Sequence, residues 1–145
     1  RARASLSGDD HEGFGALHRA AAGGHVQVAA RLLQADADVN AATGSGNTAL
    51  MLAAIAGHQH VISLLLEAGA SVNGKNREGN TALMLAAQAG NRATVERLLA
   101  ADADATLRNR KREQAATLAL AAGHNDIAEL LNAQDRSGLW LLKGF

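Results

Sequence analysis

The sequence repeats itself with a period of 33 residues. Residues 46–54, Gly-Asn-Thr-Ala-Leu-Met-Leu-Ala-Ala, return as residues 79–87, 33 positions later. The same frame extends back to Gly13 and forward to Arg112, each followed by an Ala- and Leu-rich segment. A fixed period of this length predicts a stack of similar small units rather than one closed core. Such a stack exposes an extended surface, which favours binding of a partner.

The composition predicts a core of small aliphatic side chains. Hydrophobic residues make up 48% of the chain and aromatic residues only 2%, which suits closely stacked helices. Cysteine is absent, which excludes disulfides, thiolate catalysis and Cys-zinc sites. The net charge is zero, so no general attraction to nucleic acid or to a membrane is expected. No apolar run approaches the roughly 20 residues of a membrane span.

The compartment stays open at this stage. The sequence begins with Arg1, which is compatible with removal of a signal peptide. Both the cytoplasm and the bacterial periplasm therefore remain as alternatives, and the absence of cysteine does not decide between them.

Residues 43–75 illustrate one unit of the repeat. A turn of Thr, Gly, Ser and Asn residues precedes Thr48, whose hydroxyl is placed to cap a helix predicted over residues 49–56. Gly57 ends this helix, and a second helix with the apolar run Val-Ile-Ser-Leu-Leu-Leu follows before Gly69. Helices this short are marginal alone in water, so each must bury its apolar face against neighbouring units.

Residues 33 positions apart form columns that are expected to lie inside the stack. Small Ala-Ala pairs recur where a larger side chain would force neighbouring units apart. The larger apolar columns are Val28, Val61, Thr94 and Ile127, and Leu32, Leu65, Leu98 and Leu131.

These units resemble ankyrin repeats. The family's unit is a β-turn followed by two antiparallel helices, with a Thr-Pro-Leu-His signature and a Gly-His step between the helices. Thr-Ala-Leu-Met stands at the signature position in residues 48–51 and 81–84. The step is supplied by Gly24-His25, Gly57-His58, Gly123-His124 and the variant Gly90-Asn91. The resemblance covers residues 10–134.

The resemblance implies an all-α ankyrin-repeat solenoid of stacked helix-turn-helix units joined by β-turn loops, with about four repeats and divergent terminal caps. The expected division is an N-terminal extension 1–9, repeats 10–42, 43–75 and 76–108, a degenerate capping repeat 109–134 and an apolar C-terminal tail 135–145.

Several positions depart from the family pattern. Asp36 and Asp102 stand where the second helix normally ends in Gly, which predicts local backbone strain. In the fourth unit Arg112, Glu113 and Gln114 replace the turn signature, and we interpret this polar unit as a cap.

The six histidines do not predict a metal or catalytic site. His25, His58 and His124 share one repeat position, which indicates a repeated structural role. Thr48 and Thr81 are better explained as caps than as nucleophiles, because no base or oxyanion site accompanies them. We therefore expect no catalytic residue, no cofactor and no metal.

By position, the resemblance implies that a protein partner contacts the turn tips and the exposed face of the first helices. The candidates are His11, Glu12, Phe14, Ser45, Asn47, Ile55, Arg77, Glu78, Asn80, Gln88, Arg110, Lys111 and Glu113. Phe14 and Ile55 are candidate anchors, because they are large apolar residues at exposed positions. The alternatives are that Ile55 packs against a neighbouring unit and that Phe14 covers the N-terminal end of the stack.

The densest charge lies at residues 108–112, Arg-Asn-Arg-Lys-Arg. This run is either a docking point for an acidic partner or a solvated turn that keeps the stack soluble. Nucleic acid is disfavoured, because no aromatic residues are interleaved for base stacking.

The end of the tail, residues 138–145, does not fit the repeat and contains the only Trp. We expect it to fold back over the Leu130 and Leu131 side of the last unit. Otherwise it is an adhesive segment for a partner or for a second copy of an otherwise monomeric chain.

Together these features predict a non-catalytic protein-binding module, acting as an adaptor or as an inhibitor or immunity protein of an enzyme. The alternative is a structural spacer or an engineered repeat scaffold. An enzyme would instead require a convergent polar pocket.

Overall fold

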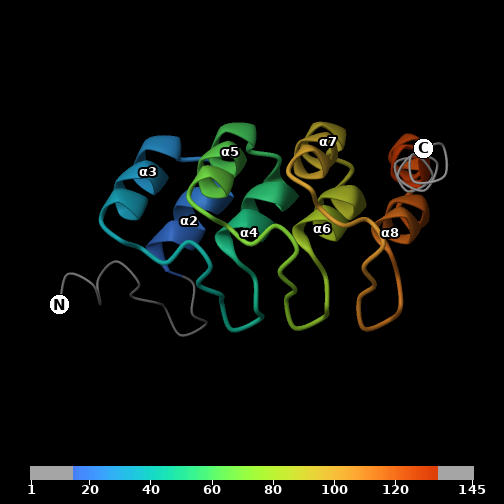
Figure 1. Cartoon of the computed structure of the whole chain (residues 1–145), viewed down its shortest axis with the longest axis horizontal. Helices are drawn as coiled ribbons and strands as arrows, with labels where there is room; N and C mark the ends of the chain where they lie inside the picture. Colours follow the sequence, from blue (N-terminus) through green and yellow to red (C-terminus); the bar gives the residue numbers. More distant parts are fainter. Residues whose placement is uncertain (1–14, 134–145) are drawn as a thin grey trace, which may run out of the picture.

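The computed structural model describes residues 15–133 of the chain. These residues form pairs of antiparallel helices separated by long loops (Figure 1). The named helices are α2 (Ala16–Gly23), α3 (Val26–Gln34), α4 (Ala49–Ala56), α5 (Gln59–Glu67), α6 (Ala82–Ala89), α7 (Arg92–Ala100) and α8 (Ala115–Ala121). Residues 125–133 are also helical and follow α8.

The helices lie in two rows. The first helix of each pair stands in an inner row, α2, α4, α6 and α8, and the second stands in an outer row (Figure 1). Contacts between neighbouring units run mainly through the inner row. The loops between units all project to the same side, beyond the inner helices (Figure 1). The predicted all-α solenoid is therefore confirmed, and within residues 15–133 extended pairing is limited to a single bridge between Ala42 and Thr48.

Threonine caps begin the two central inner helices, as the sequence predicts. Thr48 Oγ1 accepts a hydrogen bond from the Met51 backbone N at 3.3 Å, and Thr81 Oγ1 accepts one from Met84 N, also at 3.3 Å. Each bond satisfies one of the free N–H groups at a helix N-terminus. The first unit lacks this threonine, and there Gly15 N donates to His18 Nδ1 at 3.0 Å.

The core is a set of small and branched aliphatic side chains between the two rows. The Ala pairs of the inner helices are buried, and so are Leu50, Leu65, Leu83 and Leu98. Small alanines allow the inner helices to approach closely, which explains why the chain needs so few aromatic residues to fill its interior.

Val28 does not follow its column. Val61, Thr94 and Ile127 are almost fully buried, whereas Val28 is 53% exposed. At this position Thr94 contacts the preceding outer helix, since its Oγ1 accepts from Gln59 Nε2 on α5 at 2.6 Å, whereas no helix of the described residues precedes α3 in the outer row. The 33-residue period makes the four positions equivalent, but the ends of the stack do not share the same neighbours.

Side chains at the helix-to-helix step join each unit to the one before it. His58 Nε2 donates to the Ala22 carbonyl at 3.1 Å, and Asn91 Nδ2 donates to the Ala54 and Ile55 carbonyls at 3.1 and 2.9 Å. These carbonyls lie at the C-terminal end of the preceding inner helix, where no intrahelical donor remains. The predicted structural role is thus observed for His58.

No helix among residues 15–133 has the length and apolarity to cross a membrane.

Candidate functional site

Three successive turns, at residues 43–47, 76–80 and 109–113, have the same internal structure. They are called the second, third and fourth turns after the repeats to which they belong. In each, a backbone N–H donates to the carbonyl four residues later: Thr43 to Asn47, Asn76 to Asn80 and Asn109 to Glu113, with distances of 2.9–3.0 Å. The side chain of the first residue supports the turn as well. Asn76 Oδ1, for example, accepts from the backbone N atoms of Glu78 and Asn80 at 3.0 and 2.9 Å.

A relay of side-chain amides joins these turns to one another. Asn76 Nδ2 donates to Asn47 Oδ1, and Asn109 Nδ2 donates to Asn80 Oδ1, both at 2.9 Å. The backbones are joined too, since Arg77 N donates to the Ser45 carbonyl and Arg110 N to the Glu78 carbonyl at 3.0 Å. The turn tips therefore form a continuous hydrogen-bonded edge rather than separate loops.

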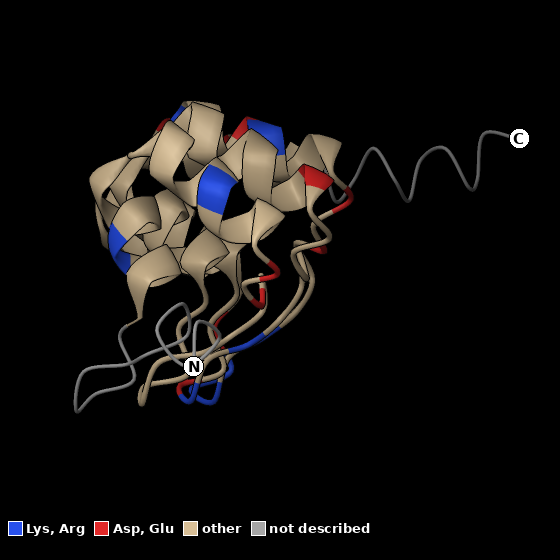
Figure 2. Cartoon of the chain, turned by 90° about the vertical axis from the view of Figure 1, so that its left-hand side faces the viewer, with Lys and Arg blue, Asp and Glu red and all other residues tan. Residues whose placement is uncertain are grey.

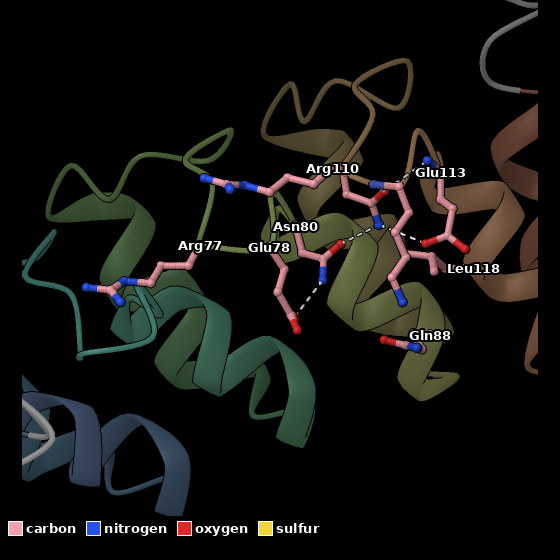
Figure 3. Close-up of a pocket in the computed structure, with 9 residues that line it drawn as sticks. Arg77, Glu78, Asn80, Gln88, Arg110, Glu113 and Leu118 are labelled. Carbon is pink, nitrogen blue, oxygen red and sulfur yellow. Dashed lines mark hydrogen bonds between the residues drawn. The ribbon is translucent and has the colours of Figure 1, made fainter.

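A cleft of about 390 Å³ opens between the third and fourth turns (Figure 3). Its lining combines turn residues with Gln88 from α6 and Leu118 from α8. Of the candidate partner-binding residues, seven line this cleft: Arg77, Glu78, Asn80, Gln88, Arg110, Lys111 and Glu113. The sequence interpretation left out Asn109 and Leu118, the other two lining residues.

The lining residues face in two directions. Arg77 and Arg110 extend the same way, while Glu113 lies on the other side, beside Asn109 (Figure 3). Asn80 is only 8% exposed, and its amide contacts both Asn109 and Glu78. Asn80 and Asn109 therefore hold the turns together, whereas the charged side chains are presented at the opening.

The other candidates lie along the same face or outside the described residues. Ser45 is exposed on the second turn, and Asn47 is partly buried because its side chain accepts from Asn76. Ile55, at 43% exposure, stands near the end of α4, one repeat before Gln88. His11, Glu12 and Phe14 lie outside residues 15–133, as does the tail from residue 138.

The histidines within the described residues do not converge. His18 lies against the Ala41 carbonyl through Nε2 at 2.9 Å, and because Nδ1 accepts from Gly15, Nε2 is the donor. His60 is exposed on α5. Between residues 15 and 133 no three His, Asp or Glu side chains gather in the way a metal ion requires.

Asp104 carries a perturbed carboxylate at the beginning of the last loop. The Thr106 hydroxyl donates to Asp104 Oδ1 at 2.6 Å and the Thr106 backbone N donates to the same atom at 2.9 Å. These two bonds stabilise the ionised form and lower the pKa of Asp104 below its ordinary value. Asp104 does not line the cleft, so this shift belongs to the structure of the loop.

A second hollow, of about 500 Å³, lies at the C-terminal end of the stack beside Leu120. Leu120 is 61% exposed, whereas Leu131 is almost fully buried and Leu130 is partly buried. Leu131 does not lie on an exposed side of the last unit, as its pairing with the tail implied, but continues the buried leucine column that the repeat period predicts. The expected position of the tail itself lies outside the described residues.

The repeated turn, the paired helices and the stacked units define a solenoid repeat protein whose unit is a turn followed by two antiparallel helices. Two family descriptions match the chain: "Ankyrin repeats (3 copies)" over residues 4–76 and "Ankyrin repeats (many copies)" over residues 65–119. The chain belongs to the ankyrin repeat family, whose repeats are generally protein–protein interaction modules. No curated protein matches the sequence.

Proposed function

We propose that this chain binds a partner protein through its turn tips and the exposed face of its inner helices, without catalysing a reaction. The observation that carries the proposal is the cleft between the third and fourth turns. Side chains from two turns and two inner helices meet there, on an edge that hydrogen bonds hold rigid. A preformed surface loses little conformational freedom on binding, which favours affinity.

The inner-helix face next to the cleft suits a protein surface. The helices α4, α6 and α8 contain no charged residue, and Ile55 supplies a partly exposed aliphatic side chain. An apolar contact flanked by charged turns is the usual arrangement of a binding interface, with a buried centre and a polar rim.

The proposal is tested with the double variant Ile55→Glu with Gln88→Arg as bait in an extract of the source organism. We expect the unaltered chain to retain one stoichiometric protein and the variant to lose it, with the helical circular dichroism signal unchanged. Val28→Glu is the matched control, because Val28 is also exposed but lies on α3, away from this face. A folded chain that retains no partner, or equal retention by all three proteins, would contradict the proposal and favour a spacer or an engineered scaffold.

The finer proposal is that the module acts as an adaptor or as an inhibitor of an enzyme. If the retained partner is an enzyme, titration with this chain separates the two roles. An inhibitor lowers the enzyme's activity in proportion to the chain added up to the equimolar point, whereas an adaptor leaves that activity unchanged.

A further inference from the structure

The positive charge of this molecule is concentrated on two neighbouring turns. Of the 14 Lys and Arg residues in the chain, six lie in the segments 75–80 and 108–113, and these two segments contain only Glu78 and Glu113 as acids. Lys and Arg gather at the loop tips in Figure 2. The preceding turn, residues 43–47, has no charged residue. The cationic region therefore ends abruptly on one side.

Two of these cations serve the turns themselves. Lys75 Nζ donates to the Arg108 carbonyl at 3.0 Å, and Arg108 Nη1 donates to the Arg112 carbonyl at 2.9 Å. Lys75 thus reaches across to the next loop, and Arg108 lies along its own loop. They add to the local positive potential without being presented at the cleft.

The three cations that line the cleft have no carboxylate partner within the described residues. Arg77, Arg110 and Lys111 are exposed, and the ion pairs that join two described residues are those of Arg92 with Glu96 and Asp126. The two glutamates of the cleft are held by amides instead. Glu113 Oε1 accepts from Asn109 Nδ2 at 3.0 Å, and Glu78 Oε1 lies 3.4 Å from Asn80 Nδ2.

We propose that the cleft between the third and fourth turns receives an acidic segment of the protein partner, a proposal that rests on the proposed function. Arginine presents a planar fork of donors that matches a carboxylate, and Arg77 and Arg110 extend in the same direction from equivalent positions of adjacent units (Figure 3). Gln88 and Leu118 line the cleft beside them and offer amide and aliphatic contacts to the same segment.

The spacing of the units indicates the spacing of the acids. Packed helices lie about 8–10 Å apart, so the two arginines begin at roughly that separation. In a polyproline II segment, residues three apart share one side and are separated by about 9 Å. We therefore expect an acidic residue followed by another three positions later.

The observations favour an acidic peptide over nucleic acid. No aromatic side chain lines the cleft, so a base has no surface on which to stack. A nucleic acid is also a continuous polyanion, whereas the cations of this edge lie on two neighbouring turns and the turn before them, residues 43–47, is uncharged.

The test is selection of random 12-residue peptides displayed on phage against the full chain. We expect enrichment of peptides with Asp or Glu at positions three apart. Affinity for the synthesised peptide should fall at least about tenfold in Arg77→Glu with Arg110→Glu. The matched control is Arg31→Glu with Arg97→Glu, which makes the same change in net charge on exposed outer-helix positions and should leave affinity within about twofold.

Three outcomes would overturn the inference. The first is enrichment of peptides without excess acid, and the second is acidic peptides whose affinity is unchanged in Arg77→Glu with Arg110→Glu. The third is tighter binding of a thymidine 12-mer than of the selected peptide. Failure of this inference is distinguishable from failure of the proposed function. Peptides that bind equally well without the two arginines, but no longer bind the Ile55→Glu variant, would contradict the acidic segment and still support the binding face. No enrichment of any peptide counts against both.

Discussion

Asp36 and Asp102 hold backbone conformations that favour glycine. Their φ angles are 68° and 69°, in the left-handed region, where a side chain crowds the following carbonyl. Gly69 occupies the equivalent position of the second unit, with a φ of 93°. The strain predicted from the sequence is therefore present at the ends of α3 and α7.

We expect Asp36→Gly and Asp102→Gly each to raise the free energy of unfolding by about 0.5–1 kcal/mol. The gain is smaller than the full left-handed penalty, because glycine also gives the unfolded chain more freedom. Urea unfolding followed by circular dichroism measures the change. The reverse substitution, Gly69→Asp, should destabilise by a similar amount, since no atom lies within 4 Å of a Cβ placed there. A lower free energy of unfolding for Asp36→Gly would show that the Asp36 side chain stabilises the fold by more than its left-handed backbone destabilises it.

Side chains that act within one unit could be predicted, and those that act between units were harder to find. The caps Thr48 and Thr81 follow from their places before helices of strong formers, and both bonds are observed. The amide relay through Asn76 and Asn109 joins residues 29 positions apart, and local propensity carries no information about such pairs. The recurrence of asparagine in the turns at this spacing was the available signal.

At the scale of the elements, the turns depend on one another through that relay. Asn109 donates to Asn80 and Glu113 and accepts from the backbone N atoms of Lys111 and Glu113. Removing this side chain leaves Asn80, a buried residue, with an unpaired oxygen. A buried polar atom without a partner is more unfavourable than the loss of an exposed hydrogen bond.

We expect Asn109→Ala to lower the free energy of unfolding by about 1–3 kcal/mol. Amide hydrogen exchange in the fourth turn should accelerate more than exchange in α4, because the damage is local in a stack of weakly dependent units. Asn125→Ala is the control, since the Asn125 side chain is exposed and has no hydrogen bond in the described residues. Equal effects of the two substitutions would argue against a relay that stabilises the turns.

The helix pairs followed from the sequence because their signals are local and repeated. A capping threonine, an apolar run and a glycine recur at fixed spacing. Each of them acts on the helix backbone within a few residues of its own position. The exposure of Val28 and Leu120 did not follow from the period. Burial in a stack depends on the neighbouring units, and the first and fourth units each have only one neighbour among the described residues.

At the scale of the whole molecule, two residues of the fourth unit oppose the docking of a fifth. A Cβ at Gly46 or Gly79 would lie 2.8 or 2.9 Å from the backbone N of the next turn. The equivalent residue in the fourth turn is Arg112, which has a Cβ at this place. Leu120 likewise replaces the alanine that is fully buried by the next inner helix in the preceding units. We therefore propose that the fourth unit is shaped as the end of the stack.

This argument predicts how the chain responds when a fifth unit is supplied. Copies of residues 101–108 and then 76–108, placed after residue 133 instead of residues 134–145, add one loop and one helix pair. On the unaltered fourth unit the added helices should exchange their amide hydrogens at nearly the unfolded rate, because the turn and inner helix cannot approach. With Arg112→Gly and Leu120→Ala, the Cβ and the larger side chain are removed, and we expect protection of the added helices and a higher urea midpoint for the whole stack. Equal protection of the added helices with and without the two substitutions would contradict this prediction. It would show that neighbouring units adjust their spacing around the Arg112 Cβ and the Leu120 side chain.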